Sequence, residues 1–366
     1  MKGLRKYISP FAPDQSGAAA VLCELGGLII ILDAGGCAGN ICGFDEPRWF
    51  ESKSAIFSAG LRDMDAILGR DDRLVKKIAM ACEKIEGKFI AVIGTPVPAV
   101  IGTDYKALKR MIEKKTGIPA ITIDTDGMEL YDIGAGKAYE ALFKMFSGKE
   151  RKKSMPEKNE KEKEKSEVGF RCLGILGATP LDVEEKEAGA IRRFYENQGW
   201  DNVFVYGMGD GIDAVQKADK IKKNIVIAPS GLKTAKYMEK KYGIPYETDY
   251  PLETLPEWEM IFSRIPELEE KKVLIVHQQM LANALRDSIL GQVNADVTVA
   301  SWFSMDKKER KEEDIFLKEE DQWITLIDEN EYDVIIADGL FARAVPKFTG
   351  EYWILPHFAV SGKRKG

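Results

Sequence analysis

The sequence has few of the side chains from which metal and redox sites are usually built. Its 366 residues include two histidines and five cysteines. Five cysteines in a chain of this length do not form the disulfide framework of a small secreted domain. No basic and apolar secretory signal precedes the first apolar elements. We therefore expect a cytoplasmic protein whose thiols are reduced.

Long apolar runs and an excess of positive charge are lacking too. The longest apolar stretch, residues 18–32, contains Glu24 and paired glycines, so it falls short of the ~20 residues that a membrane helix needs. The net charge of −6 arises from mixed charges and gives no basic face. There is no P-loop, so ATP use by this chain is not indicated. Composition therefore argues against nucleic acid or a membrane as a partner.

What the sequence has in abundance is an alternation of apolar runs with helical patterns. This βαβ rhythm is typical of parallel sheets. Strands are predicted at residues 28–32, 89–93, 120–123, 172–176, 202–206, 224–228, 272–276, 296–300, 334–337 and 352–355. Helices are predicted at residues 15–25, 71–85, 104–114, 136–145, 183–198 and 211–218. The fold class is therefore α/β, with three Rossmann-like units in series.

A charged stretch separates the first unit from the second. Residues 147–168 are almost entirely Lys, Glu and other polar residues and cannot bury enough apolar surface to order themselves. We expect a flexible linker here. The predicted domains are a cluster-binding Rossmann-like domain at 1–146, a second at 169–266 and a third at 267–366.

Two cysteines, Cys37 and Cys42, lie in a glycine-rich segment that directly follows the apolar run 28–32 and is predicted to be a loop. Ligands bind at the carboxyl ends of parallel strands. The spacing disfavours zinc, which prefers a C-x2-C knuckle and a second pair elsewhere. Iron–sulfur clusters use four thiolates, so two copies of this pair in a dimer would complete a [4Fe–4S] site. The alternative is two small thiols that only pack in the core.

Asp14 and Thr95 are further candidates for the same site. Asp14 precedes the predicted helix 15–25, where it either caps the helix or faces the segment of Cys37. Thr95 follows the predicted strand 89–93, where its hydroxyl either lines the same crevice or satisfies the turn before Pro96.

The two histidines, His277 and His357, each follow a predicted strand of the third unit. Parallel strands would bring both to one edge of that sheet, where a proton donor or a metal ligand is conceivable. The alternative is that each caps a helix or satisfies a loop carbonyl. They are the candidates for catalytic residues.

Several segments resemble the component 1 subunits of nitrogenase and the related tetrapyrrole reductases. Residues 33–37 (DAGGC) resemble the loop whose cysteine ligates the interface cluster, and Cys37 is kept. Residues 9–18 (SPFAPDQSGA) and 92–104 (VIGTPVPAVIGTD) resemble two further cluster segments, with Asp14 and Thr95 at the cysteine positions. Residues 66–74 (AILGRDDRL) and 238–245 (MEKKYGIP) extend the resemblance.

This resemblance implies a homodimer or paralogous heterodimer of three-domain subunits. It also implies an iron–sulfur cluster at the subunit interface and a separate ATP-hydrolysing iron protein that delivers electrons. Because only one of the three cluster cysteines is retained, an eight-iron cluster is disfavoured, and Cys42 is the compensating thiol. No residue matches the cysteine that anchors the iron–molybdenum cofactor in this family, and the chain is shorter than its catalytic subunits, so dinitrogen reduction is disfavoured.

The function expected is that of an oxidoreductase component, a nitrogenase-like reductase subunit that passes electrons to an unidentified substrate. Two alternatives stay open: a non-catalytic scaffold or carrier for a metallocluster, and a small-molecule binding module that has lost the cluster.

Overall fold

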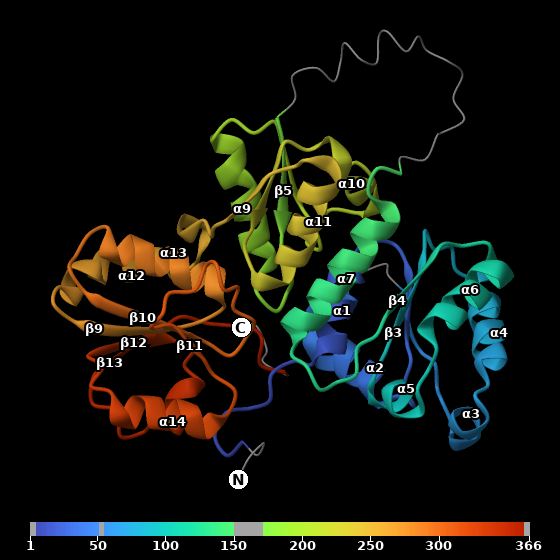
Figure 1. The fold of residues 1–366 in the computed structure, drawn as a ribbon, viewed down its shortest axis with the longest axis horizontal. Coiled ribbons are helices and arrows are strands. Elements are labelled where there is room, and N and C mark those ends of the chain that lie inside the picture. The colour runs from blue at the N-terminus through green and yellow to red at the C-terminus, as the bar shows by residue number, and fades with distance from the viewer. Residues whose placement is uncertain (1–4, 51–54, 150–170, 362–366) are drawn as a thin grey trace, which may run out of the picture.

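The computed structural model describes residues 5–50, 55–149 and 171–361, which form three parallel sheets with helices on their faces (Figure 1). The predicted α/β class is confirmed. Most of the predicted linker 147–168 lies outside the described residues, and the three domain boundaries stay predictions. No helix in the described ranges is long and apolar enough to span a membrane.

The first sheet has the order β2-β1-β3-β4. Its central strands β1 (Leu28–Ile31) and β3 (Ile90–Ile93) are buried at every residue, which is why they appear as continuous apolar runs. The edge strands are β4 (Ala120–Ile123) and β2 (Ala55–Ser58). Strand β2 was not predicted, because it is a short and half-exposed edge strand.

Helices cover the two faces of the first sheet with different sets of side chains. On one face lie α4 (Asp71–Cys82) and α6 (Tyr105–Thr116), which share a core with Leu28, Ile30 and Val92. On the other lie α1 (Asp14–Leu22) and α7 (Tyr131–Phe146), which share a core with Ile29 and Ile31. The alternation of side chains along β1 thus supplies both cores.

The second sheet has the order β6-β5-β7-β8 and the third the order β11-β10-β9-β12-β13. The second contains β5 (Cys172–Leu176), β6 (Asn202–Val205), β7 (Lys223–Val226) and β8 (Tyr246–Thr248), with α9 (Glu185–Asn197), α10 (Ile212–Gln216) and α11 (Leu232–Tyr242). The third contains β9 (Lys272–Val276), β10 (Asp296–Ser301), β11 (Ile315–Phe316), β12 (Val334–Ala337) and β13 (Glu351–Ile354), with α12 (Trp258–Arg264), α13 (Gln279–Leu290) and α14 (Glu320–Glu329).

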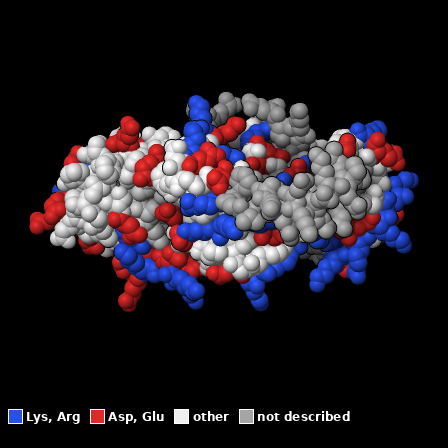
Figure 2. Space-filling view, turned by 90° about the horizontal axis from the view of Figure 1, so that it is seen from above, with Lys and Arg blue, Asp and Glu red and all other residues white. Residues whose placement is uncertain are grey.

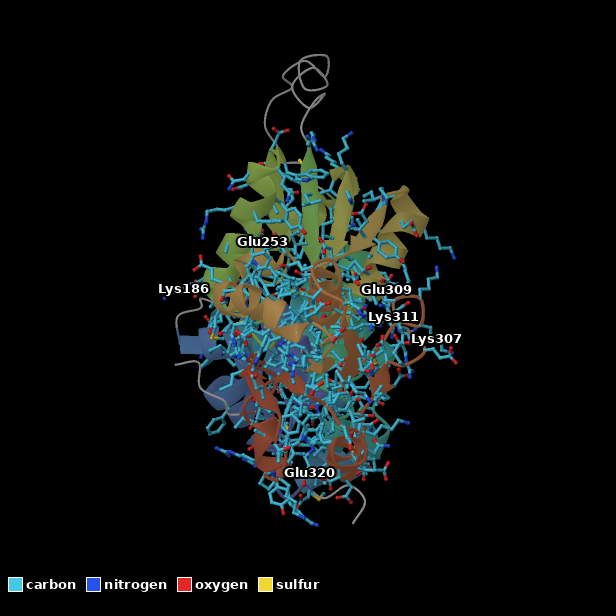
Figure 3. All side chains as sticks on the ribbon, turned by 90° about the vertical axis from the view of Figure 1, so that its left-hand side faces the viewer. Lys186, Glu253, Lys307, Glu309, Lys311 and Glu320 are labelled. Atoms are coloured by element: carbon cyan, nitrogen blue, oxygen red, sulfur yellow. The ribbon has the colours of Figure 1, made fainter. Side chains whose placement is uncertain are left out.

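The two ends of the described chain meet beside the third sheet. Phe11 and Val360 form an antiparallel bridge, and the N–H of Ala12 donates to the carbonyl of Ala359 at 2.7 Å. Glu320, labelled in Figure 3, accepts backbone N–H groups of residues 6–8, and these bonds lower the pKa of its carboxyl although burial opposes them. The segment before α1 is thus fastened to the third sheet's elements, while α1 itself packs on the first sheet.

Candidate functional site

The glycine-rich segment after β1 is helical, and the expectation of a loop there is wrong. It forms α2 (Gly36–Asn40) and then a π-helical turn (Ile41–Asp45) closed by the N–H of Glu46 and the carbonyl of Ile41. Buried Asp33 supports this path, because its carboxylate accepts the N–H of Ala38 at 2.8 Å and the Ser58 hydroxyl at 2.6 Å. Single π-helical turns are frequent at functional sites.

Cys37 and Cys42 both lie in this segment, and both are half-buried. Burial raises the pKa of the Cys37 thiol, and the carboxylate of Asp33 adds to the effect. Burial also raises the pKa of the Cys42 thiol, with contributions from Glu46 and Asp33. Both thiols therefore hold their protons at neutral pH unless a metal ion displaces them.

Thr95 lies beside Cys37 and is fully buried. Its hydroxyl donates to the carbonyl of Leu32 at 2.8 Å and is within hydrogen-bonding reach of the Cys37 thiol. The hydroxyl therefore does not satisfy the turn before Pro96, which was one alternative from the sequence. It joins the ends of β1 and β3 instead. The structure therefore brings Thr95 and Cys37 together, as predicted from the strand ends.

Asp14 is fully buried as the first residue of α1, and Pro13 occupies the N-cap position. The expected cap geometry is therefore wrong. The Asp14 carboxylate accepts backbone N–H groups of Asp126 at 3.0 Å and Gly127 at 2.8 Å, which fasten α1 to the loop after β4. Burial raises the pKa of this carboxyl, and the two N–H bonds oppose the shift. Asp14 thus has a structural role, because it fastens the start of α1 to the loop after β4.

Exposed apolar side chains lie at the same edge of the first sheet as the two cysteines. They follow the carboxyl ends of its four strands: Phe44 after β1, Met64 and Leu68 after β2, Val97, Val100 and Ile101 after β3, and Met128 after β4. Val100 is 86% and Met128 83% exposed. We call this set the cysteine edge. Apolar side chains gathered on one edge are typical of a surface that another protein covers.

The two histidines form a separate cluster in the interior. The rings of His277 and His357 stack, with centroids 4.1 Å apart and planes 20° apart, and both side chains are buried. His277 Nε2 lies 3.2 Å from the carbonyl of Pro356, so one sequence alternative, a satisfied loop carbonyl, is borne out for this residue. Burial and the neighbouring His357 lower the pKa of His277 to about 3.

Two further residues complete this buried histidine cluster, Tyr131 on α7 and Asp182 after β5. The Tyr131 hydroxyl donates to Asp182 at 2.5 Å and lies 3.1 Å from His357 Nε2. Asp182 also accepts from the Thr179 hydroxyl at 2.9 Å. Burial and Asp182 raise the pKa of Tyr131. Sequence reasoning missed both residues, because no local motif marks them and only the packing of all three sheets brings them to His357.

Neither group of residues forms a complete metal site within one chain. Among the described residues, no three His, Cys, Asp or Glu side chains lie together in a metal-binding arrangement. On the face shown in Figure 2, the cationic and anionic side chains of the described residues are interspersed.

A family model, described as nitrogenase component 1 type oxidoreductase, matches residues 15–255. Among curated proteins, the chain is 31% identical over 192 residues to the nitrogenase iron-molybdenum cofactor biosynthesis protein NifE of Clostridium pasteurianum. This match covers 52% of this chain and 38% of that protein. The NifE protein of Klebsiella pneumoniae is 25% identical over 262 residues, which cover 66% of this chain and 55% of that protein. The chain thus matches about two fifths to a little over half of these relatives' length.

Solved structures agree with this assignment at the level of the fold. A structure titled "Nitrogenase Cp1 at pH 6.5" superposes with a TM-score of 0.70 at 14% identity and covers 100% of this chain and 89% of that one. The same protein at pH 5 gives a TM-score of 0.66 at 16% identity, covering 98% and 85%. The chain belongs to the nitrogenase component 1 type oxidoreductase family.

Proposed function

We propose that this chain is a subunit of a nitrogenase-like complex that holds an iron–sulfur cluster between itself and a second subunit. Cys37 and Cys42 supply its thiolate ligands from this side. The observation that carries the proposal is the position of two half-buried thiols in the cysteine edge, a surface whose exposed apolar side chains suit a subunit interface. A second copy or a paralogous subunit supplies the remaining ligands.

The residues present fit such a cluster as a half-site. Thiolates are the ligands that iron–sulfur clusters use, and four are the usual number. The space beside the thiols is open: a Cβ built on Gly35, Gly36, Gly39 or Gly43 would meet no heavy atom within 4 Å. This backbone therefore leaves room for a bulky inorganic group or a partner chain. A [4Fe–4S] cluster shared between two subunits matches the two thiols that each would contribute.

The chain's own residues would prepare these thiols for metal binding. Cys37 and Cys42 hold their protons in the free protein, because burial and the carboxylates of Asp33 and Glu46 raise their pKa values. Binding of iron therefore releases protons and becomes tighter as the pH rises. Thr95 would hold Cys37 in place by its bond to β1, and the α2–π-helix path would fix the spacing of the two sulfurs.

The names of the relatives support a role in metallocluster assembly. The matched proteins are cofactor biosynthesis proteins by name, so we propose a scaffold or carrier that holds a metallocluster or its precursor for another protein. This scaffold works in the cytoplasm.

A second function is favoured by the buried histidine cluster. Reduction of a substrate consumes protons together with electrons, and Tyr131 and His357 are proton-carrying groups placed deep inside the fold. In this function the subunit passes electrons from an ATP-dependent iron protein to a substrate.

The first experiment tests the cluster itself. We expect the full chain, purified anaerobically from cells supplied with iron, to contain iron and sulfide and to absorb visible light. Cys37→Ser and Cys42→Ser should each lose most of the iron, because each removes one of only two thiolates on this side. Cys82→Ser is the matched control, since Cys82 is a half-buried thiol on α4.

A colourless, iron-free protein whose properties are unchanged by Cys37→Ser would contradict the proposal. If the cluster is present, mixing experiments separate the two functions. A scaffold transfers iron and sulfide to an apo-protein and shows no turnover with an iron protein and ATP, whereas a reductase subunit shows turnover and keeps its cluster.

A further inference from the structure

A cavity of about 210 Å³ lies where elements of all three sheets meet. One wall is the start of α7, which packs on the first sheet. A second is the 3-10 turn Pro229–Gly231 with the start of α11, which follow β7 of the second sheet. The third is the segment after β10 of the third sheet. Neither Cys37 nor Cys42 lines this cavity.

Asp132 gives the cavity a buried negative charge. Its side chain is 4% exposed and accepts the backbone N–H of Ser304 at 2.9 Å. Burial raises the pKa of this carboxyl, and Asp182 nearby adds to the shift. Within the described ranges no Lys, Arg or His forms an ion pair with it. The N-terminus of α7 offsets part of the cost of a buried carboxylate, but a cation remains its best partner.

Lys233 gives the cavity a positive charge at its mouth. It lies exposed on the first turn of α11 and has no ion-pair partner among the residues that the structure covers. The neighbouring Lys236 differs, because it pairs with Asp306 at 2.6 Å. Of the four charged residues of the lining, Lys236 and Asp306 pair with each other. The exposed Lys233 and the buried Asp132 have no ion-pair partner among the described residues.

The rest of the lining is mainly apolar. Ile133, Leu232 and Met305 face the space, together with Ser230, whose hydroxyl is buried and has no hydrogen-bond partner among the described residues. The segment that carries Met305 continues to Lys307, Glu309 and Lys311 at the outer edge of the molecule (Figure 3), which are not part of the lining. The volume corresponds to about seven water molecules at ~30 Å³ each, enough for a small organic molecule.

We infer that this cavity binds a small apolar α-amino acid, with its ammonium group at Asp132, its carboxylate at Lys233 and its side chain against Ile133, Leu232 and Met305. A zwitterion of this size supplies an ion-pair partner for each of the two charges. The inference goes beyond the proposed cluster function and does not depend on it.

The test is isothermal titration of the full chain with L-valine and two analogues that each lack one charge. Isobutylamine is valine without the carboxylate, and isovalerate is valine without the ammonium group. We expect valine to bind and each analogue to bind at least about tenfold more weakly, because an unpaired charge in or near a buried site is costly. Valine should also raise the thermal midpoint of unfolding.

Variants assign the two charges. Lys233→Gln should weaken valine binding about tenfold and leave the binding of isobutylamine unchanged. Asp132→Asn should weaken valine and isobutylamine alike. Lys240→Gln is the matched control, because Lys240 is an exposed lysine on the same helix and does not line the cavity.

The inference is overturned if valine gives no saturable heat, if isovalerate or isobutylamine binds as tightly as valine, or if Lys233→Gln binds valine like the wild type. Lys233→Gln keeps the test decisive even if Asp132→Asn does not fold, since Lys233 is exposed. Cys37→Ser should bind valine normally, so a failure of the cluster proposal and a failure of this one are separable.

Discussion

Arg48 is a buried cation that joins elements of the first sheet to elements of the second. Its guanidinium donates to the carbonyl of Ala20 on α1 and to that of Gly207 after β6, each at 2.6 Å. It also pairs with Glu46 at 2.7 Å and Glu24 at 3.1 Å. Burial lowers the pKa of Arg48, but Glu46 and Glu24 outweigh this and raise it overall. This one side chain thus contacts polar groups of Ala20, Glu24, Glu46 and Gly207.

At the residue scale we therefore predict that Arg48→Met lowers the free energy of unfolding by about 3–5 kcal/mol, as expected when one partner of a buried ion pair is removed. The loss arises because the Glu46 side chain, fully buried, keeps its charge without a partner. Chemical denaturation measures the change.

The double variant Arg48→Met/Glu46→Gln is the control for this explanation. It should recover part of the loss, because no buried charge is left unpaired. A double variant less stable than Arg48→Met alone would show that lost packing, and not the stranded carboxylate, is responsible.

At the scale of elements, α1 and α7 cross at two glycines. A Cβ on Gly17 would lie 1.9 Å from the carbonyl oxygen of Tyr131, and one on Gly134 would lie 1.8 Å from that of Asp14. Backbone meets backbone at both points, so no side chain can move aside. This close approach sets the position of Asp14 and Tyr131, the first residues of the two helices, and so links the first sheet to the buried histidine cluster.

We predict that Gly17→Ala and Gly134→Ala each destabilise the protein by about 1–3 kcal/mol, although alanine favours helix formation, because overpacking must push the helices apart. Gly189→Ala on α9 is the matched control. Its Cβ would contact only the end of the Arg193 side chain at 3.5 Å, so we expect it to stabilise the protein by up to about 1 kcal/mol. Thermal or urea unfolding measures the change in stability of each of the three variants. Equal changes in all three would contradict the explanation by overpacking between α1 and α7.

At the scale of the whole molecule, stability should depend on pH through two buried groups whose pKa values are shifted in opposite directions. Burial and His357 lower the pKa of His277 to about 3, below its unfolded value near 6.5, so the unfolded chain binds this proton first. The stability that neutral His277 contributes is complete above pH 6.5 and is lost as the pH falls toward 3. Burial raises the pKa of Glu187 to about 7, so its contribution is lost as the pH rises from about 4.5 to 7.

Comparison with a variant isolates the histidine. We predict that, as the pH falls from about 6 to 4, the stability of His277→Phe increases relative to that of the wild type by about 1.4 kcal/mol for each pH unit. The titratable neighbours of His277, namely His357, Asp182 and Asp338, are common to both proteins. Urea unfolding at several pH values gives the slope, and parallel stability curves would show that His277 already binds a proton in the folded state.

The sequence by itself determined the order of most strands, the helices α1, α4, α6, α7, α9 and α10, and the placement of Cys37, Cys42 and Thr95 at strand ends. It did not predict α11, α12, α13 and α14. Apolar periodicity is a local property, so the buried strands β3, β5, β9 and β12 were found within a residue or exactly. Short, half-exposed strands such as β8 and β11 were missed, because their residues carry little apolar pattern.

Only the tertiary structure decided what these residues contact. The helical path of residues 36–45 depends on the buried carboxylate of Asp33, and no glycine-rich sequence signals such support. The partners of His357, Tyr131 and Asp182, are 226 and 175 residues away in sequence, and the lining of the cavity comes from three sheets. Local patterns do not encode such contacts, since they arise from the packing of whole elements against one another.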